Sequence, residues 1–181
     1  MKKVILTILM MFIILKAYTL EENRVACDMN ISEACFNVAL MEKNTTRSLL
    51  FYEKSCLLKN AEGCFNLGEN YRKGSGTKID NSKALKLYNR SCQLGLLDGC
   101  QNLANMYNYG IGTDINQTKA FEIYQLLCDK NQSSSCYSLG LLYYNSIEIK
   151  KDIKYAGKLF KKACDLGSEN GCKNYRILRV K

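Results

Sequence analysis

Ten cysteines are the residues of this chain whose type and spacing point most clearly to chemistry. They form five pairs, each separated by eight positions: Cys27 and Cys35, Cys56 and Cys64, Cys92 and Cys100, Cys128 and Cys136, Cys164 and Cys172. Zinc knuckles need about two to four residues between ligands, and the chain has no such pair and no histidine. The spacing therefore indicates disulfides in an oxidising compartment, and we predict no metal site and no cofactor. Without histidine, Ser-His-Asp and Cys-His catalysis are also excluded.

The cysteine pairs mark an internal repeat. From Cys56 onward they recur every 36 residues, and several leucine, tyrosine and alanine positions keep the same step. This period is typical of helical solenoids, and apolar residues at helical spacing predict helical hairpins. The expected segments are a partial helix over 20–31, hairpins over 32–59, 61–95, 97–131 and 133–167, and a capping helix over 169–181. Together they make residues 20–181 one all-α solenoid.

A turn must lie between the two cysteines of each pair. Eight residues of continuous helix would place their Cα atoms about 12 Å apart, beyond the limit of about 7 Å for a disulfide. Around Cys92 and Cys100, the intervening Gly95 is placed to end one helix before the next begins. Each pair is therefore expected to join one hairpin to the next, and we call such a pair a disulfide clasp.

Asparagines recur two positions after the second cysteine of each pair. They are Asn37, Asn66, Asn102 and Asn174, with Ser138 at the remaining position. An amide can both donate to and accept from an extended peptide backbone, so this row is a candidate binding surface. Glu69, Arg72, Asn105 and Asn108 lie nearby and could supply specificity. The alternative is that the asparagines are solvated polar positions or cap the preceding turn.

The first 19 residues have the pattern of a secretory signal peptide. Lys2 and Lys3 precede a short apolar stretch, Val4–Leu15, that is too short to span a bilayer. Removing residues 1–19 leaves 23 basic against 17 acidic residues, and four of the basic residues lie in the last nine positions. We therefore expect a periplasmic or secreted monomer with no membrane segment and no nucleic-acid partner.

Four asparagines stand in acidic-x-Asn-x-Ser/Thr sequences: Asn30, Asn44, Asn116 and Asn131. This pattern resembles the extended acceptor sequon of bacterial periplasmic N-glycosylation, and all four fall in predicted turns. A mass above that of the bare oxidised chain would show the modification. The alternative is that turn and cap chemistry alone enriches these residue types there.

The repeat resembles a known family. Gly63–Tyr71, then Gly74-Ser75-Gly76, and then Ser91–Gly95 resemble a Sel1-like repeat. With a clasp in every repeat, the chain is similar to the secreted Helicobacter cysteine-rich protein family. The unit starting at Cys136 departs from the pattern, because Asn145–Glu148 replaces its glycine loop. The resemblance implies a right-handed α-solenoid.

The same resemblance implies two functions. Related solenoids bind a protein or peptide on their concave face, and tetratricopeptide domains use such asparagines there. The alternative is a β-lactamase or penicillin-binding protein, and a peptidoglycan fragment is a third candidate ligand. Ser75-Gly76-Thr77-Lys78 alone matches the Ser-x-x-Lys pattern, but it lies in a glycine loop, so we assign no catalytic residue.

Overall fold

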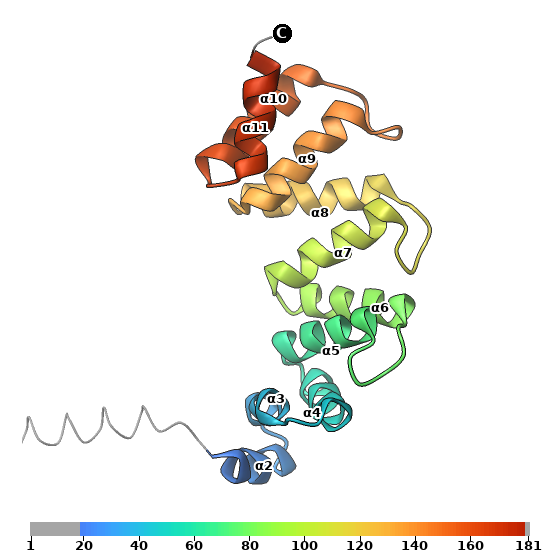
Figure 1. Ribbon diagram of the computed structural model, residues 1–181, viewed down its shortest axis with the longest axis vertical. Helices are drawn as coiled ribbons and strands as arrows, with labels where there is room; N and C mark the ends of the chain where they lie inside the picture. The colour runs from blue at the N-terminus through green and yellow to red at the C-terminus, as the bar shows by residue number, and fades with distance from the viewer. Residues whose placement is uncertain (1–18, 180–181) are drawn as a thin grey trace, which may run out of the picture.

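A computed structural model describes residues 19–179 as ten helices without a strand. The helices stack into an elongated solenoid with α2 at one end and α11 at the other (Figure 1). They are α2 Leu20–Asp28, α3 Ser32–Met41, α4 Thr45–Leu57, α5 Ala61–Lys73, α6 Asn81–Gln93, α7 Leu97–Tyr109, α8 Gln117–Asp129, α9 Ser133–Asn145, α10 Ile153–Asp165 and α11 Glu169–Arg179. None of these helices is long and apolar enough to cross a membrane. The predicted signal peptide lies, apart from Thr19, outside the described residues.

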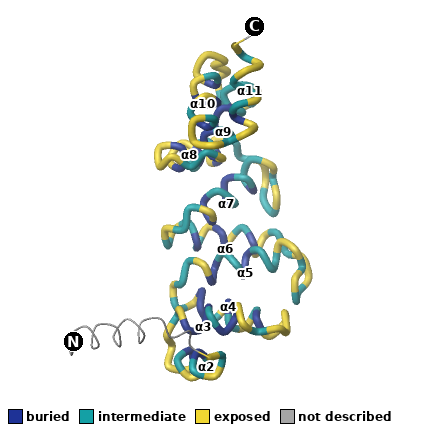
Figure 2. Tube along the Cα trace, turned by 60° about the vertical axis from the view of Figure 1, so that its left-hand side comes forward, coloured by how far each residue is buried: buried dark blue, intermediate teal, exposed yellow. Residues whose placement is uncertain are grey.

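Consecutive helices pack against each other along the whole stack, and buried residues recur in every hairpin (Figure 2). Side-chain caps explain where the second helix of each hairpin begins. Asn44, Asp80, Asn116 and Asp152 each accept a hydrogen bond from a backbone N–H three residues later. The centre of the stack is filled by Tyr88, Tyr124 and Phe160, all fully buried.

All five predicted disulfide clasps are present. Their Cα atoms lie 4.4–4.6 Å apart, and each clasp joins the end of one helix to the start of the next across a short turn. No free cysteine remains among the described residues. The expected all-α solenoid with disulfides between successive hairpins is confirmed.

Small residues bring the two helices of each clasp together. A Cβ atom added at Gly99 in α7 would lie 2.5 Å from Oγ of Ser91 in α6, and Gly63 meets Ser55 at the same distance. The Ser91 hydroxyl donates a 2.8 Å hydrogen bond to the Ala61 carbonyl, which also connects α6 to the preceding helix. At these two junctions the clasp therefore closes a helix crossing that is too tight for a side chain at Gly63 or Gly99.

The glycine loop is replaced in the last hairpin, where the sequence departs from the repeat. In the preceding hairpin, Gly112 packs against the start of α6, and Ser82 Oγ donates to its carbonyl at 3.1 Å. In the last hairpin Glu148 Oε2 instead accepts from the Thr118 N–H at 3.2 Å. Ser146 Oγ donates to Gln117 Oε1 at 2.8 Å. Side chains thus take over the contact that a glycine backbone makes elsewhere.

Two glycine-to-alanine variants separate helix crossing from helix propensity. Gly99→Ala forces α6 and α7 apart and should lower the free energy of unfolding by about 1–3 kcal/mol, as overpacking does. Gly157→Ala in α10 meets only Leu178, at 3.8 Å. It should raise that free energy by about 0.5–1 kcal/mol through helix propensity. Urea unfolding followed by circular dichroism measures both, and equal effects would contradict the tight crossing.

Candidate binding surface

The predicted asparagines occupy one repeated position, on the first helix of three hairpins and on the capping helix. Asn37 lies on α3, Asn66 on α5, Asn102 on α7 and Asn174 on α11, with Ser138 on α9. All five residues are half-buried. We call this row the asparagine ladder, and it runs from one end of the described solenoid to the other.

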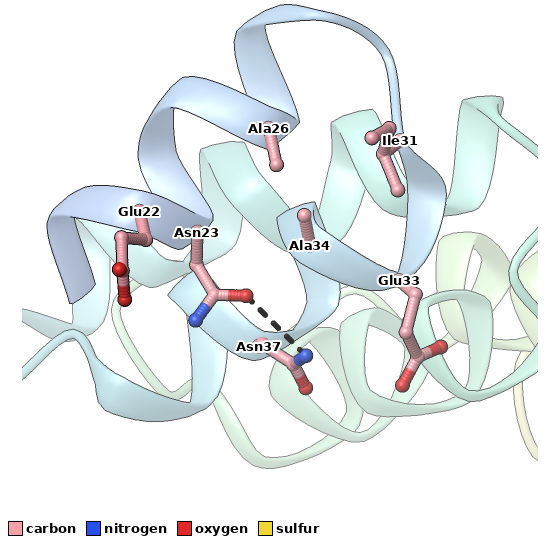
Figure 3. Close-up of a pocket in the computed structure, with 7 residues that line it drawn as sticks. All are labelled: Glu22, Asn23, Ala26, Ile31, Glu33, Ala34 and Asn37. Carbon is pink, nitrogen blue, oxygen red and sulfur yellow. Dashed lines mark hydrogen bonds between the residues drawn. The ribbon is translucent and has the colours of Figure 1, made fainter. Parts of the chain in front are cut away.

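Two ladder amides are engaged within the chain. Asn37 Nδ2 donates to Asn23 Oδ1 at 3.4 Å (Figure 3). Asn102 Nδ2 donates to Glu69 Oε1 at 3.1 Å. The side chains of Asn66 and Asn174 make no hydrogen bond to any described residue. These two half-buried amides are therefore not engaged by any described residue.

Glu69 is the centre of the largest polar network beside the ladder. Its Oε1 accepts hydrogen bonds from Asn102 and from the hydroxyl of buried Tyr88, and its Oε2 pairs with Arg72 at 3.0 Å and with Lys73 at 2.5 Å. Partial burial alone would raise the Glu69 pKa, but the hydrogen bonds from Arg72, Lys73 and Tyr88 lower it to about 2. The carboxylate is therefore ionised and held in place.

The neighbouring repeats replace this charge with neutral groups. Asn105 occupies the position of Glu69 in the next repeat, and its Oδ1 accepts a 2.6 Å hydrogen bond from the Tyr124 hydroxyl. One repeat further, Leu141 stands at this position, and the tyrosine is replaced by Phe160. Burial raises the pKa of Tyr124, as expected for a hydroxyl that stays protonated. The surface thus changes from charged to polar to apolar toward α11.

A cavity lies at each end of the ladder. One, of about 260 Å³, opens between α2 and α3 (Figure 3). It is lined by Glu22, Asn23, Ala26, Ile31, Glu33, Ala34 and Asn37. The other, of about 170 Å³, is lined by Leu141, Tyr144, Asn145, Phe160, Asn174, Ile177 and Leu178. Both ends of the ladder therefore offer space for a side chain beside an amide.

The structure also places the other sequence candidates. Asn108 Oδ1 accepts from Gln117 at 3.4 Å. Ser75 is exposed in the α5–α6 loop, and its N–H bonds to the Asn70 carbonyl at 3.0 Å, which closes α5. Its neighbour Gly74 has a φ of 73°. The Ser-x-x-Lys sequence thus lies in a helix-ending turn. Among residues 19–179, no three acidic or cysteine side chains gather as metal ligands.

The four sequon asparagines fall into two kinds of site. Asn44 and Asn116 are helix N-caps whose side chains accept from Arg47 and Lys119. Asn30 and Asn131 are exposed, lie inside clasp turns and have positive φ values of 63° and 61°. The side-chain amides of Asn30 and Asn131 therefore do not cap a helix.

These features define a helical repeat solenoid with a disulfide in every repeat junction. Sel1 repeats match residues 32–60, 61–96, 97–132 and 133–168. The chain therefore belongs to the Sel1 repeat family, and the expected Sel1-like repeat is confirmed.

The chain is similar to several known proteins. A protective antigen of uropathogenic Escherichia coli with an SLR fold is 20% identical, with a TM-score of 0.85 over 90% of this chain and 36% of its own. Helicobacter pylori cysteine rich protein B is 26% identical over 84% of this chain and 89% of its own, with a TM-score of 0.47. Cytochrome c oxidase assembly factor 7A of Xenopus laevis is 33% identical over 67 residues. The chain spans 29% of that curated relative.

Glu69 should make stability depend on acid pH. Because its folded pKa is lowered from 4.5 to about 2, its stabilisation is complete above pH 4.5 and is lost as pH falls toward 2. Glu69→Gln should therefore unfold at lower urea than the wild type at pH 7, with the difference shrinking below pH 4.5. Solvent screening keeps the effect small. Glu53→Gln, on the exposed face of α4, is the control, and an equal loss there would contradict the network.

Proposed function

We propose that this chain is an exported, oxidised Sel1 repeat protein that binds an extended peptide segment of a protein partner along the asparagine ladder. The observation that carries the proposal is the pair of half-buried, unengaged amides at Asn66 and Asn174 in a row that crosses every hairpin. An extended backbone presents one donor and one acceptor per residue, which such amides match without regard to sequence.

The neighbours of the ladder supply specificity in this proposal. The ionised Glu69 with Arg72 and Lys73 makes the middle of the row charged, whereas the α9–α11 end is apolar. A bound segment with a polar centre and one large apolar residue toward α11 would match both the charged middle of the ladder and its apolar end. The cavity between α2 and α3, which Asn37 lines, takes a further side chain at the opposite end.

The disulfides also bear on the compartment in which the protein works. Five disulfides indicate an oxidising environment, because cytosolic thiols are kept reduced. The signal-like residues 1–19 provide the route to the periplasm or the exterior.

Asn30 and Asn131 are the proposed glycan acceptors, since their amides are exposed and do not cap a helix. Hydrolysis of β-lactams gains no support from the described residues, where Ser75 is a turn residue.

The test is selection of binding peptides from a random phage-displayed library against the oxidised protein, followed by titration of a selected synthetic peptide. Asn66→Ala and Asn174→Ala should each weaken binding about five- to tenfold, as loss of a hydrogen bond of about 1–1.5 kcal/mol would. Asn89→Ala, at an exposed position of α6 away from the ladder, should have no effect. Peptides whose affinity is the same for all four proteins would refute the ladder as the binding surface.

A further inference from the structure

The net positive charge of the described residues lies at one end of the solenoid. Residues 19–145 carry 13 basic and 13 acidic side chains, so their charges balance. Residues 146–179 carry nine basic and four acidic side chains. The last hairpin and α11 therefore present a cationic surface, whereas the rest of the described chain is neutral overall.

This cationic end also holds a cavity that is larger than either cavity at the ends of the asparagine ladder. It measures about 600 Å³ and lies between α10 and α11. Ile153, Gly157, Tyr175 and Leu178 give it an apolar floor, and Lys154, Lys158, Lys161 and Arg179 complete its lining. Of these residues, only Leu178 also lines the cavity at the end of the asparagine ladder. The two surfaces are therefore distinct.

The cavity exists because one repeat position lacks its usual side chain. Seven positions before the first cysteine of each clasp, the hairpins carry Leu49, Leu85 and Phe121, but α10 carries Gly157. The Phe121 ring packs on Tyr143 of the next helix, with ring centroids 5.4 Å apart. At Gly157 an added Cβ would have Leu178 at 3.8 Å as its sole neighbour. The missing side chain leaves a hollow that a partner's apolar side chain can fill.

Four cations line this hollow, and two of them have no partner among the described residues. Lys154 and Lys158 are exposed and make no hydrogen bond or ion pair with a described residue. Lys161 Nζ forms an ion pair with Asp165 Oδ2 at 2.6 Å. The Arg179 guanidinium carbon lies 5.7 Å from the centroid of the Tyr175 ring. Two lysines are thus available to carboxylates while their neighbours fix the rim of the cavity.

We propose that the α10–α11 cavity binds an acidic peptide segment of a partner protein, with a large apolar residue in the hollow at Gly157 and flanking carboxylates on Lys154 and Lys158. The charge of the surface selects an acidic ligand. The concave shape favours an inserted side chain, because helices that bind bilayers present protruding apolar residues instead. This site goes beyond the ladder and does not depend on it.

The probe is a fluorescein-labelled peptide with a central phenylalanine and two glutamates on each side, titrated with the oxidised protein by fluorescence anisotropy. Saturable binding to one site is expected, weakening as salt rises. The double variant Lys154→Glu, Lys158→Glu should bind at least about tenfold more weakly. Gly157→Phe should do the same by filling the hollow, and Phe121 shows that the repeat accommodates this side chain.

The control is Lys86→Glu, Lys130→Glu, which makes the same change of charge at exposed positions of the other hairpins. It should bind like the wild type, and circular dichroism should show that every variant is folded. A misfolded Gly157→Phe would leave the lysine variants as the deciding comparison. No saturable binding, equal weakening by the control, or binding to phosphatidylglycerol vesicles in place of the peptide would each overturn the proposal.

Discussion

The close crossing between the end of one hairpin and the start of the next is the contact on which the whole solenoid depends. Gly63 and Gly99 leave room for Ser55 and Ser91, and a disulfide closes each crossing within 4.4–4.6 Å between Cα atoms. In a solenoid each repeat touches only its neighbours, so the stability of the stack depends on the contact at every junction. Closing a loop of about nine residues contributes about 2–3 kcal/mol in the chain-entropy model, and the chain does so five times.

The repeat also places the proposed binding surfaces. Because the hairpins recur every 36 residues from Cys56 onward, residues at one repeat position line up along the stack, and the asparagine ladder results. The position that holds Leu49, Leu85 and Phe121 is filled in three hairpins and empty at Gly157. The same regularity therefore creates a continuous polar row and one local hollow. The repeat departs from its own pattern at Glu69, beside the proposed ladder site, and at Gly157, in the proposed α10–α11 site.

The sequence predicted the architecture well because its signals are local. Cysteine spacing, helical periodicity and glycine turns act within a few residues, so the clasps and the helical hairpins could be expected. The hydrogen bond from Tyr88 to Glu69 could not be predicted from the sequence, because it joins two helices and because Asn105 and Leu141 replace Glu69 in other repeats. The engagement of Asn37 and Asn102 was missed for the same reason. The hollow at Gly157 did leave a signal, because a glycine breaks the apolar series at the 36-residue step.

The most direct test of this account is to compare urea unfolding of the oxidised protein with that of the fully reduced and alkylated protein, both followed by circular dichroism. The account predicts one cooperative transition for the oxidised chain and loss of most helical signal without urea for the reduced chain, because five clasps together contribute about as much stability as a typical domain has in total. Equal transition midpoints for the two forms would contradict it, and the helix packing alone would then hold the solenoid together.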